Sequence, residues 1–160
     1  MRAHVLLTLP ASLFLVACGH EHGHEDPDVE ACEHIAGGPY TPVTATTQTT
    51  GAPAIAADHR AYTVTLPADP NGFGGFVSFA SGEAVPYIFY VDQNVVAAFT
   101  TSGGAPITPQ MSGTSVAACT EVMGRHVVPL QVGTAYIGLS SPTVSTVNVV
   151  VEPALVDHDH

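Results

Sequence analysis

Histidine is the residue that stands out in this chain of 160 residues, which contains nine histidines. Three of them, His20, His22 and His24, lie close together near the N-terminus, and His158 and His160 lie at the C-terminal end. Aspartate and glutamate are interleaved with both groups. Neutral imidazole is a common ligand of zinc, copper and nickel, and nearby carboxylates add oxygen ligands and attract the cation. Both segments are therefore predicted to bind metal; the alternative is that they are solubilising spacers.

Three further histidines, His34, His59 and His126, lie in the part of the chain that we expect to fold. His34 is two residues from Cys32, and His126 is seven residues from Cys119. A disulfide between these cysteines would bring His34 and His126 into one neighbourhood. His59 would complete a three-histidine site if the chain folds back there, with an open fourth position on a zinc or copper ion. The alternative for each histidine is a surface or capping role.

The types of ligand limit the choice of ion. Imidazole and carboxylate suit Zn²⁺, Cu²⁺ and Ni²⁺, whereas Cu⁺ prefers thiolate and thioether ligands. Met111 and Met123 do not form a methionine motif. We therefore expect zinc ahead of copper as the bound metal. Protonation of the ligands should weaken binding as the pH falls below the imidazole pKa of about 6.5.

The first 17 residues have the pattern of a bacterial lipoprotein signal peptide. A positive charge at Arg2 precedes an apolar run over residues 5–14, which is shorter than the ~20 residues that a transmembrane helix needs. Leu15-Val16-Ala17-Cys18 matches the lipobox, which predicts that Cys18 carries lipid and begins the mature protein. Gly19 follows, not the aspartate typical of inner-membrane retention, so we expect an outer-membrane lipoprotein on the periplasmic or surface face. The alternative is an ordinary signal peptide with an incidental cysteine.

Cys32 and Cys119 are the two cysteines that remain once Cys18 is assigned to lipid. An even pair in an exported protein most often forms a disulfide. Closing a loop of this length would stabilise the fold by ~4 kcal/mol in the chain-entropy description. The competing interpretation is that one or both thiolates are metal ligands.

Composition excludes several classes of function. The formal net charge is −11, the chain has no lysine, and charged residues make up only 11% of it. Such a surface repels phosphate backbones, so nucleic acid is not expected as a partner, and cations are the natural counter-ligands. Signatures of nucleophilic hydrolases, zinc proteases, phosphate-binding loops and dinucleotide sites are missing from the sequence, so we do not expect an enzyme.

The middle of the chain alternates short apolar runs with turn residues, which predicts the all-β class. We expect a single antiparallel β-sandwich, jelly-roll-like, with about eight or nine short strands. Residues 1–17, 18–31, 32–153 and 154–160 are predicted to be, in this order, the signal peptide, a lipid-anchored flexible linker, the sandwich domain and a His/Asp-rich tail. A short helical turn is expected from about Asp28 to Gly37. The predicted strands are 43–49, 61–66, 75–80, 87–92, 95–100, 115–119, 127–132, 134–139 and 144–152.

The end of the chain resembles a known type of module. Leu130-Gln131-Val132-Gly133-Thr134-Ala135-Tyr136-Ile137-Gly138-Leu139 and then Val147-Asn148-Val149-Val150-Val151 give a strand, a Gly-x-Tyr-like turn, a second strand and a final alternating strand. In this respect residues 62–152 resemble the small β-sandwich modules exemplified by the bacterial pre-peptidase C-terminal domain, although Ala135 intervenes before Tyr136. The resemblance implies a fold and no activity. With Ala31-Cys32-Glu33-His34 after a His-rich leader, the chain also resembles small His-rich proteobacterial lipoproteins.

These patterns together predict an envelope lipoprotein that captures or delivers a divalent transition metal. Its expected partners are the ion, the membrane through the lipid alone, and a metal transporter or another envelope protein. The alternative is a non-catalytic structural or protein-interaction module of the cell envelope, in which the His-rich tails are spacers.

Overall fold

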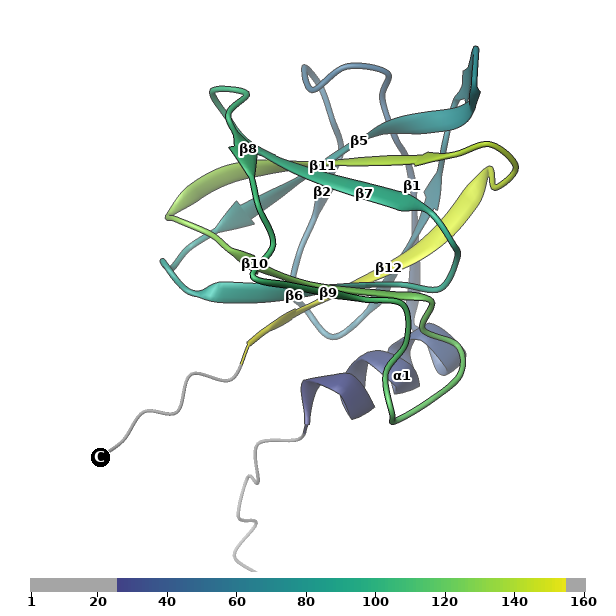
Figure 1. The fold of residues 1–160 in the computed structure, drawn as a ribbon, viewed down its shortest axis with the longest axis vertical. Helices are drawn as coiled ribbons and strands as arrows, with labels where there is room; N and C mark the ends of the chain where they lie inside the picture. The colour runs from purple at the N-terminus through teal and green to yellow at the C-terminus, as the bar shows by residue number, and fades with distance from the viewer. Residues whose placement is uncertain (1–25, 155–160) are drawn as a thin grey trace, which may run out of the picture.

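The structure is a computed structural model that describes residues 26–154. Two β-sheets pack face to face, and one helix lies against the outer face of one of them (Figure 1). The all-β sandwich predicted from the alternation is confirmed. The predictions for residues 1–25 and 155–160, including lipidation of Cys18, lie outside the described residues. Within residues 26–154, no helix is long and apolar enough to cross a membrane.

Each sheet combines strands from early and late parts of the chain. Sheet A runs in the order β1 (Tyr40–Thr44), β3 (Ala61–Thr65), β12 (Thr146–Pro153), β6 (Pro86–Val91), β10 (Gly124–Pro129) and β9 (Met111–Gly113). Sheet B runs β2 (Ala54–Ile55), β5 (Gly72–Ser81), β11 (Gly133–Ser141), β7 (Val96–Thr101) and β8 (Pro106–Ile107), and β4 (Ala68–Asp69) pairs with β5.

Two strand pairs depart from the expected antiparallel arrangement. β1 pairs with β3 in parallel, and β2 pairs with β5 in parallel, while all other pairings are antiparallel. The reason lies in the connections. The chain crosses from β1 in sheet A to β2 in sheet B and back to β3 in sheet A. Because each such crossover brings the chain back to the same end of the sheet, the strand that follows runs parallel to the strand before the crossover.

The strand predicted over residues 115–119 is wrong, because this segment is part of the loop between β9 and β10. Val116, Cys119 and Val122 all pack against the cluster beneath the helix. Their spacing of three residues differs from the period of two that a strand requires. Small residues and the bond from Cys119 let the loop follow the helix instead of pairing with the sheet.

Sheet A is covered on both faces. Towards sheet B it contributes to a core that includes Phe79, Phe89 and Phe99. Towards the helix it contributes Ile88 and Tyr90 to a second buried cluster. This double cover explains why nearly every residue of β6 and much of β12 is buried, where a strand with one solvated face would alternate.

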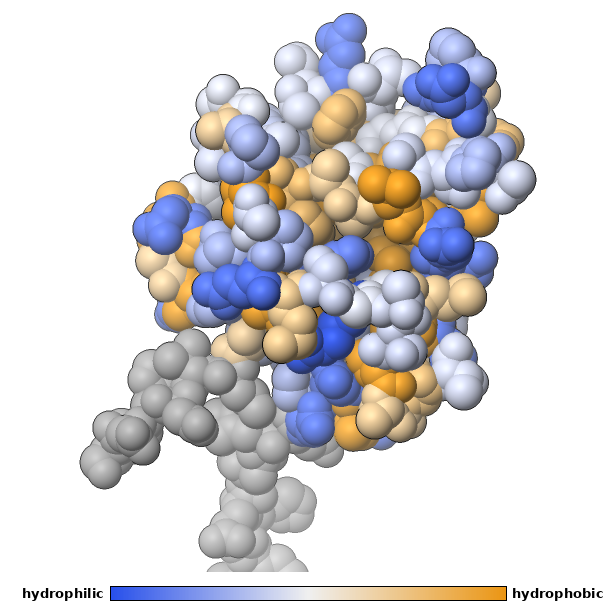
Figure 2. Space-filling model, viewed as in Figure 1, coloured by the Kyte–Doolittle hydropathy of each residue, from blue (hydrophilic) through white to orange (hydrophobic). Residues whose placement is uncertain are grey.

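Apolar side chains that remain exposed are scattered. Among the described residues, the most exposed large apolar side chains are Val96 on β7, Met111 on β9 and Val132 in the turn between β10 and β11. On the face drawn in Figure 2, polar and apolar residues are interspersed. Isolated apolar residues of this kind are normal on a protein surface.

Helix α1 (Pro27–Gly37) begins earlier than expected. Asp26 caps it by accepting a hydrogen bond from the backbone N–H of Asp28 at 2.9 Å, and proline occupies the first helical position, where its missing N–H costs nothing. The flexible linker expected over residues 18–31 therefore does not extend past Asp26 in the described part of the chain. Residues 27–31 belong to the folded domain.

The disulfide predicted between Cys32 and Cys119 is confirmed. Their Cα atoms are 5.9 Å apart, and the bond joins α1 to the loop between β9 and β10. Both sulfurs are committed to each other, so neither is a metal ligand in this structure. Thiolate ligation, the competing interpretation, does not describe the oxidised protein.

Candidate metal centre

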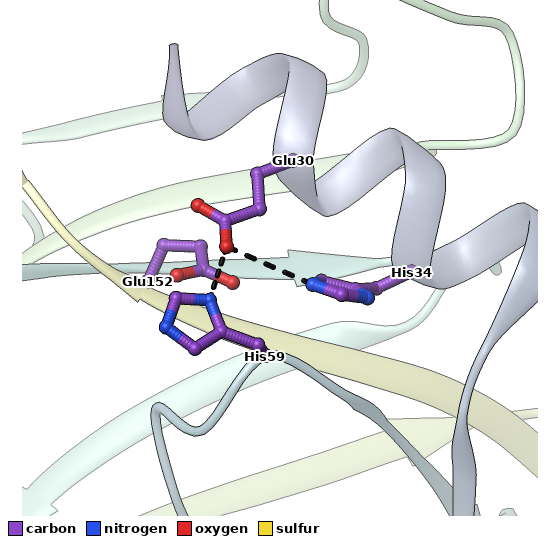
Figure 3. A group of neighbouring side chains, drawn as sticks. All are labelled: Glu30, His34, His59 and Glu152. Carbon is purple, nitrogen blue, oxygen red and sulfur yellow. Dashed lines mark hydrogen bonds and ion pairs between the residues drawn. The ribbon is translucent and has the colours of Figure 1, made fainter. Parts of the chain in front are cut away.

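Four side chains converge between α1 and sheet A. Glu30 and His34 come from the helix, His59 from the turn before β3, and Glu152 from β12 (Figure 3). One ligand atom from each of the four lies within 4.8 Å of the others. We refer to Glu30, His34, His59 and Glu152 as the His/Glu cluster.

The helix aligns Glu30 with His34. Residues four apart lie on the same face of an α-helix, and Nε2 of His34 is 3.7 Å from Oε1 of Glu30. The face that contains Ala31 and Ile35 is buried against the sheet, which fixes the rotation of the helix about its axis. Packing of α1 therefore sets the direction in which both ligands point.

A backbone carbonyl determines which nitrogen of His34 is free. Nδ1 of His34 lies 3.1 Å from the carbonyl oxygen of Gly38. Because a carbonyl oxygen can only accept, Nδ1 donates its proton there and Nε2 faces the cluster. Gly38 has φ +77°, and a Cβ at this position would lie 2.8 Å from the ring of Tyr40. This arrangement matches the hydrogen bond from the second ring nitrogen that orients metal-binding histidines.

His59 adopts an unusual backbone conformation. Its φ of +56° is the one positive value among the non-glycine residues that the structure describes. Such conformations cost on the order of 1–3 kcal/mol and persist where the surroundings enforce them, often at functional sites. Here the conformation accompanies a hydrogen bond between Nδ1 of His59 and Glu30. That bond is the main cause of the raised pKa of His59.

The sheet register explains why Glu152 meets His59. β12 pairs with β3 so that Val147 lies opposite Val64 and Val149 lies opposite Tyr62. Continuing this antiparallel register brings Glu152 opposite His59. Alternation along β12 puts Val151 in the core between the sheets and Glu152 on the helix side.

Glu152 is the most deeply buried residue of the cluster. It is only 2% exposed, and its Oε1 has no hydrogen-bond partner among the residues that the structure describes. Burial, followed by the negative charge of Glu30, raises the pKa of Glu152 to about 7. A buried carboxylate oxygen without a partner is costly and calls for an explanation. A proton or a bound cation would supply the missing interaction.

Within the described part of the chain, no fixed positive charge neutralises the carboxylates of Glu30 and Glu152. Residues 26–154 contain two arginines and no lysine; Arg60 pairs with Asp58 and Arg125 pairs with Asp28, each at 2.8 Å. Neutral His34 presents the lone pair of Nε2 towards an oxygen of Glu30, so two acceptors face each other. The cluster is therefore suited to hold positive charge.

The geometry fits a small divalent ion. Zinc binds nitrogen and oxygen ligands at about 2.0–2.2 Å, which puts the donors of a tetrahedral site about 3.4 Å apart. The donors of the cluster lie within 4.8 Å, so side-chain rotations that move them inward would close the site. Two ionised carboxylates and two neutral imidazoles together carry two negative charges, which a divalent cation balances. His59, whose side chain is 69% exposed, leaves a path for entry.

No protein-family model matches the chain, and none of the curated protein sequences matches it either.

The structure brings together two of the three histidines that were expected to share a site. His34 and His59 have ring centroids 6.2 Å apart, whereas His126 is not in the cluster. His126 lies on β10, where alternation turns it towards sheet B: its ring packs 5.8 Å from that of Phe99, and Nδ1 lies 3.0 Å from the hydroxyl of Ser112. The expectation that the disulfide would bring His126 to His34 is wrong because the strand points this side chain away from the helix.

The other predicted ligands, His20, His22, His24, His158 and His160, lie outside the described residues. Glu30 and Glu152 were not predicted as ligands. For Glu30, a signal was available in its spacing of four residues from His34. For Glu152, the signal was Val150, an apolar residue on the same face of the strand, which implies that this face is covered.

Proposed function

We propose that this protein is an envelope lipoprotein that binds a divalent transition metal, zinc ahead of copper, at the His/Glu cluster and acts in metal capture or delivery. The single observation that carries the proposal is Glu152. A buried carboxylate with an unpartnered oxygen faces two imidazoles and a second carboxylate, and no arginine or lysine in the described residues pairs with it.

The ligand types support zinc. Imidazole nitrogen and carboxylate oxygen suit Zn²⁺, Cu²⁺ and Ni²⁺, and the two sulfurs that would attract Cu⁺ are bonded to each other. Four protein ligands around one ion are typical of sites that hold zinc without catalysis, because catalytic sites keep a position open. In this proposal the His-rich tails collect metal at low affinity and the cluster retains it.

The direct test is isothermal titration of the chain from Gly19 to His160 with Zn²⁺ and with Cu²⁺. To separate the cluster from the tails, we would replace His20, His22, His24, His158 and His160 with asparagine; we call this protein the tail variant. We expect the tail variant to bind one Zn²⁺ with a Kd of about 1 μM or tighter. Absence of binding tighter than about 1 mM would contradict the proposal.

Two further substitutions assign the binding. His34→Asn with His59→Asn, made in the tail variant, should abolish binding of zinc. His126→Asn is the matched control, because His126 lies outside the cluster, and it should leave the Kd unchanged. Unchanged binding by the protein with both cluster histidines replaced would show that the ion is held elsewhere.

A structural role for the cluster is the second candidate, in a non-catalytic module of the envelope. The ion pair between His59 and Glu30 and the raised pKa of Glu152 favour it, because protons could hold the cluster together without a metal. In that case His34→Asn with His59→Asn lowers the free energy of unfolding, and zinc changes the unfolding midpoint of neither protein.

A further inference from the structure

Cys32 lies between the two ligands that α1 supplies. It is two residues after Glu30 and two before His34, and it is only 8% exposed. Two residues correspond to a rotation of about 200° around a helix, so the sulfur points away from the face that carries the ligands. The bond to Cys119 therefore attaches the opposite side of the helix to the body of the protein.

The His/Glu cluster has two halves on different parts of the fold. Glu30 and His34 move with α1, whereas His59 and Glu152 belong to the sandwich. Only a docked helix brings the halves together.

Several contacts besides the disulfide hold α1 on the sandwich. Ala31 and Ile35 pack on the sheet, and the carboxylate of Asp28 accepts hydrogen bonds from Tyr90 at 2.6 Å and Arg125 at 2.8 Å. The hydroxyl of Tyr40 donates to the carbonyl oxygen of Ile35 at 2.8 Å, and Glu30 is hydrogen-bonded to His59. An eleven-residue helix has little stability of its own in water. Reduction would leave the helix docked through these non-covalent contacts alone.

We propose that the Cys32–Cys119 disulfide controls the metal affinity of the His/Glu cluster, so that the oxidised protein holds the ion and reduction releases it. This inference rests on the proposed function. It gives the site a redox-dependent release step, in which the reductant is a dithiol of the kind carried by thiol–disulfide oxidoreductases.

The exchange takes place in two steps. A thiolate of the dithiol attacks the sulfur of Cys119, the more exposed partner, and Cys32 leaves as a thiolate. The second thiol of the reductant then attacks the reductant's other sulfur, which is bonded to Cys119 in the mixed disulfide, and Cys119 leaves as a thiolate. The dithiol ends as a disulfide, having given up two electrons and two protons, and Cys32 and Cys119 end as thiols.

Loss of affinity follows from the population of the docked helix. The apparent Kd equals the intrinsic Kd divided by the fraction of molecules in the competent state, so a helix docked one-tenth of the time binds about tenfold more weakly. While the helix is docked, the freed thiol of Cys32 points away from the cluster and adds no ligand to it.

The first experiment compares Zn²⁺ binding by the oxidised tail variant and by the same protein with Cys32→Ser and Cys119→Ser. We expect the serine protein to keep one site per chain and to bind at least about tenfold more weakly. An unchanged Kd in a serine protein with a native circular dichroism spectrum would overturn the inference. If instead the oxidised tail variant binds no zinc, the proposed function has failed and not only its regulation.

A second measurement decides the matter if the serine protein does not fold. Binding that needs the docked helix must in turn protect the disulfide, because linkage between two sites is reciprocal. In a glutathione redox buffer at equilibrium, the fraction of protein with the disulfide intact should be higher with Zn²⁺ than without it. Adding His59→Asn to the tail variant should remove this difference. Equal fractions with and without Zn²⁺ in the tail variant would refute the coupling.

Discussion

The two faces of sheet A are both buried, but they are built from different kinds of residue. Towards sheet B, Phe79, Phe89 and Phe99 pack with aliphatic side chains, and neighbouring ring centroids lie about 5 Å apart. Towards α1, apolar residues share the interface with Glu152 and with Asp28, whose carboxylate bonds to Arg125. The strands β3, β6, β10 and β12 each contribute residues to both faces.

The difference separates what the fold needs from what the site needs. We call the side of sheet A towards sheet B the inner face and the side towards α1 the outer face. Apolar burial alone stabilises the inner face, since burying a large apolar side chain is favourable and needs no hydrogen-bond partner. The outer face contains charged groups that add little to stability when buried and cost a great deal when unpaired. Charged groups on this face are what the proposed metal site requires, and apolar burial alone does not call for them.

The largest effect is expected on the inner face. Phe89 is 1% exposed and touches both Phe79 and Phe99. Phe89→Ala should lower the free energy of unfolding by about 3–5 kcal/mol, because it removes buried surface and leaves a cavity. Urea unfolding would measure the loss.

The matched variant on the outer face is Ile35→Ala, in the buried side of α1. It should cost about 2–4 kcal/mol and also weaken zinc binding, whereas Phe89→Ala should leave the Kd of the folded protein unchanged. Equal effects of the two variants on zinc binding would remove the distinction between the faces.

Glu152→Gln should act in opposite directions on stability and on binding. Because the pKa of Glu152 is raised to about 7, the folded protein keeps a proton that the unfolded chain loses, so stability falls as the pH rises from about 4.5 through 7. At about pH 8 without metal, the substitution should raise the free energy of unfolding by about 2–3 kcal/mol and abolish zinc binding.

The control for this variant is Glu83→Gln, at an exposed position in the turn between β5 and β6. It should change neither stability nor zinc binding. A metal-free Glu152→Gln protein that is less stable than the wild type at high pH would mean that the carboxylate is satisfied without an ion.

The same contrast explains how far sequence alone could lead. Alternation in residues such as Tyr62-Thr63-Val64-Thr65-Leu66 predicted the sandwich, because period-two burial is a local property. The disulfide was predicted from the parity of the cysteines. The cluster was only half predicted: His34 and His59 were named, but Glu152 acquires its role from a helix that covers its face, and that cover depends on tertiary packing.

Asp28→Asn tests the polar part of the helix interface more gently. Asp28 is not the capping residue of α1, but its carboxylate accepts hydrogen bonds from both Tyr90 and Arg125 on the sheet. Loss of its charge should lower the free energy of unfolding by about 1–2 kcal/mol. Thermal unfolding would show it. Glu33→Gln, on the exposed side of the same helix, should have no effect, and a shift of equal size there would assign the loss to helix charge in general.

The smallest effect is expected at His126, the histidine that faces the inner core. Burial lowers its pKa, so the folded protein keeps the ring neutral while the unfolded chain takes up a proton below about pH 6.5. The stability that the neutral ring confers is therefore lost as the pH falls from the ordinary pKa of histidine through the lowered pKa of His126 in the folded protein. His126→Gln should flatten this acid-side slope, measured as the difference between urea midpoints at about pH 7.5 and about pH 5 with a chelator present. Because His126 lies across the sheet from the His/Glu cluster, the substitution should leave zinc binding at neutral pH as it was, and a change there would mean that the two faces of sheet A are coupled.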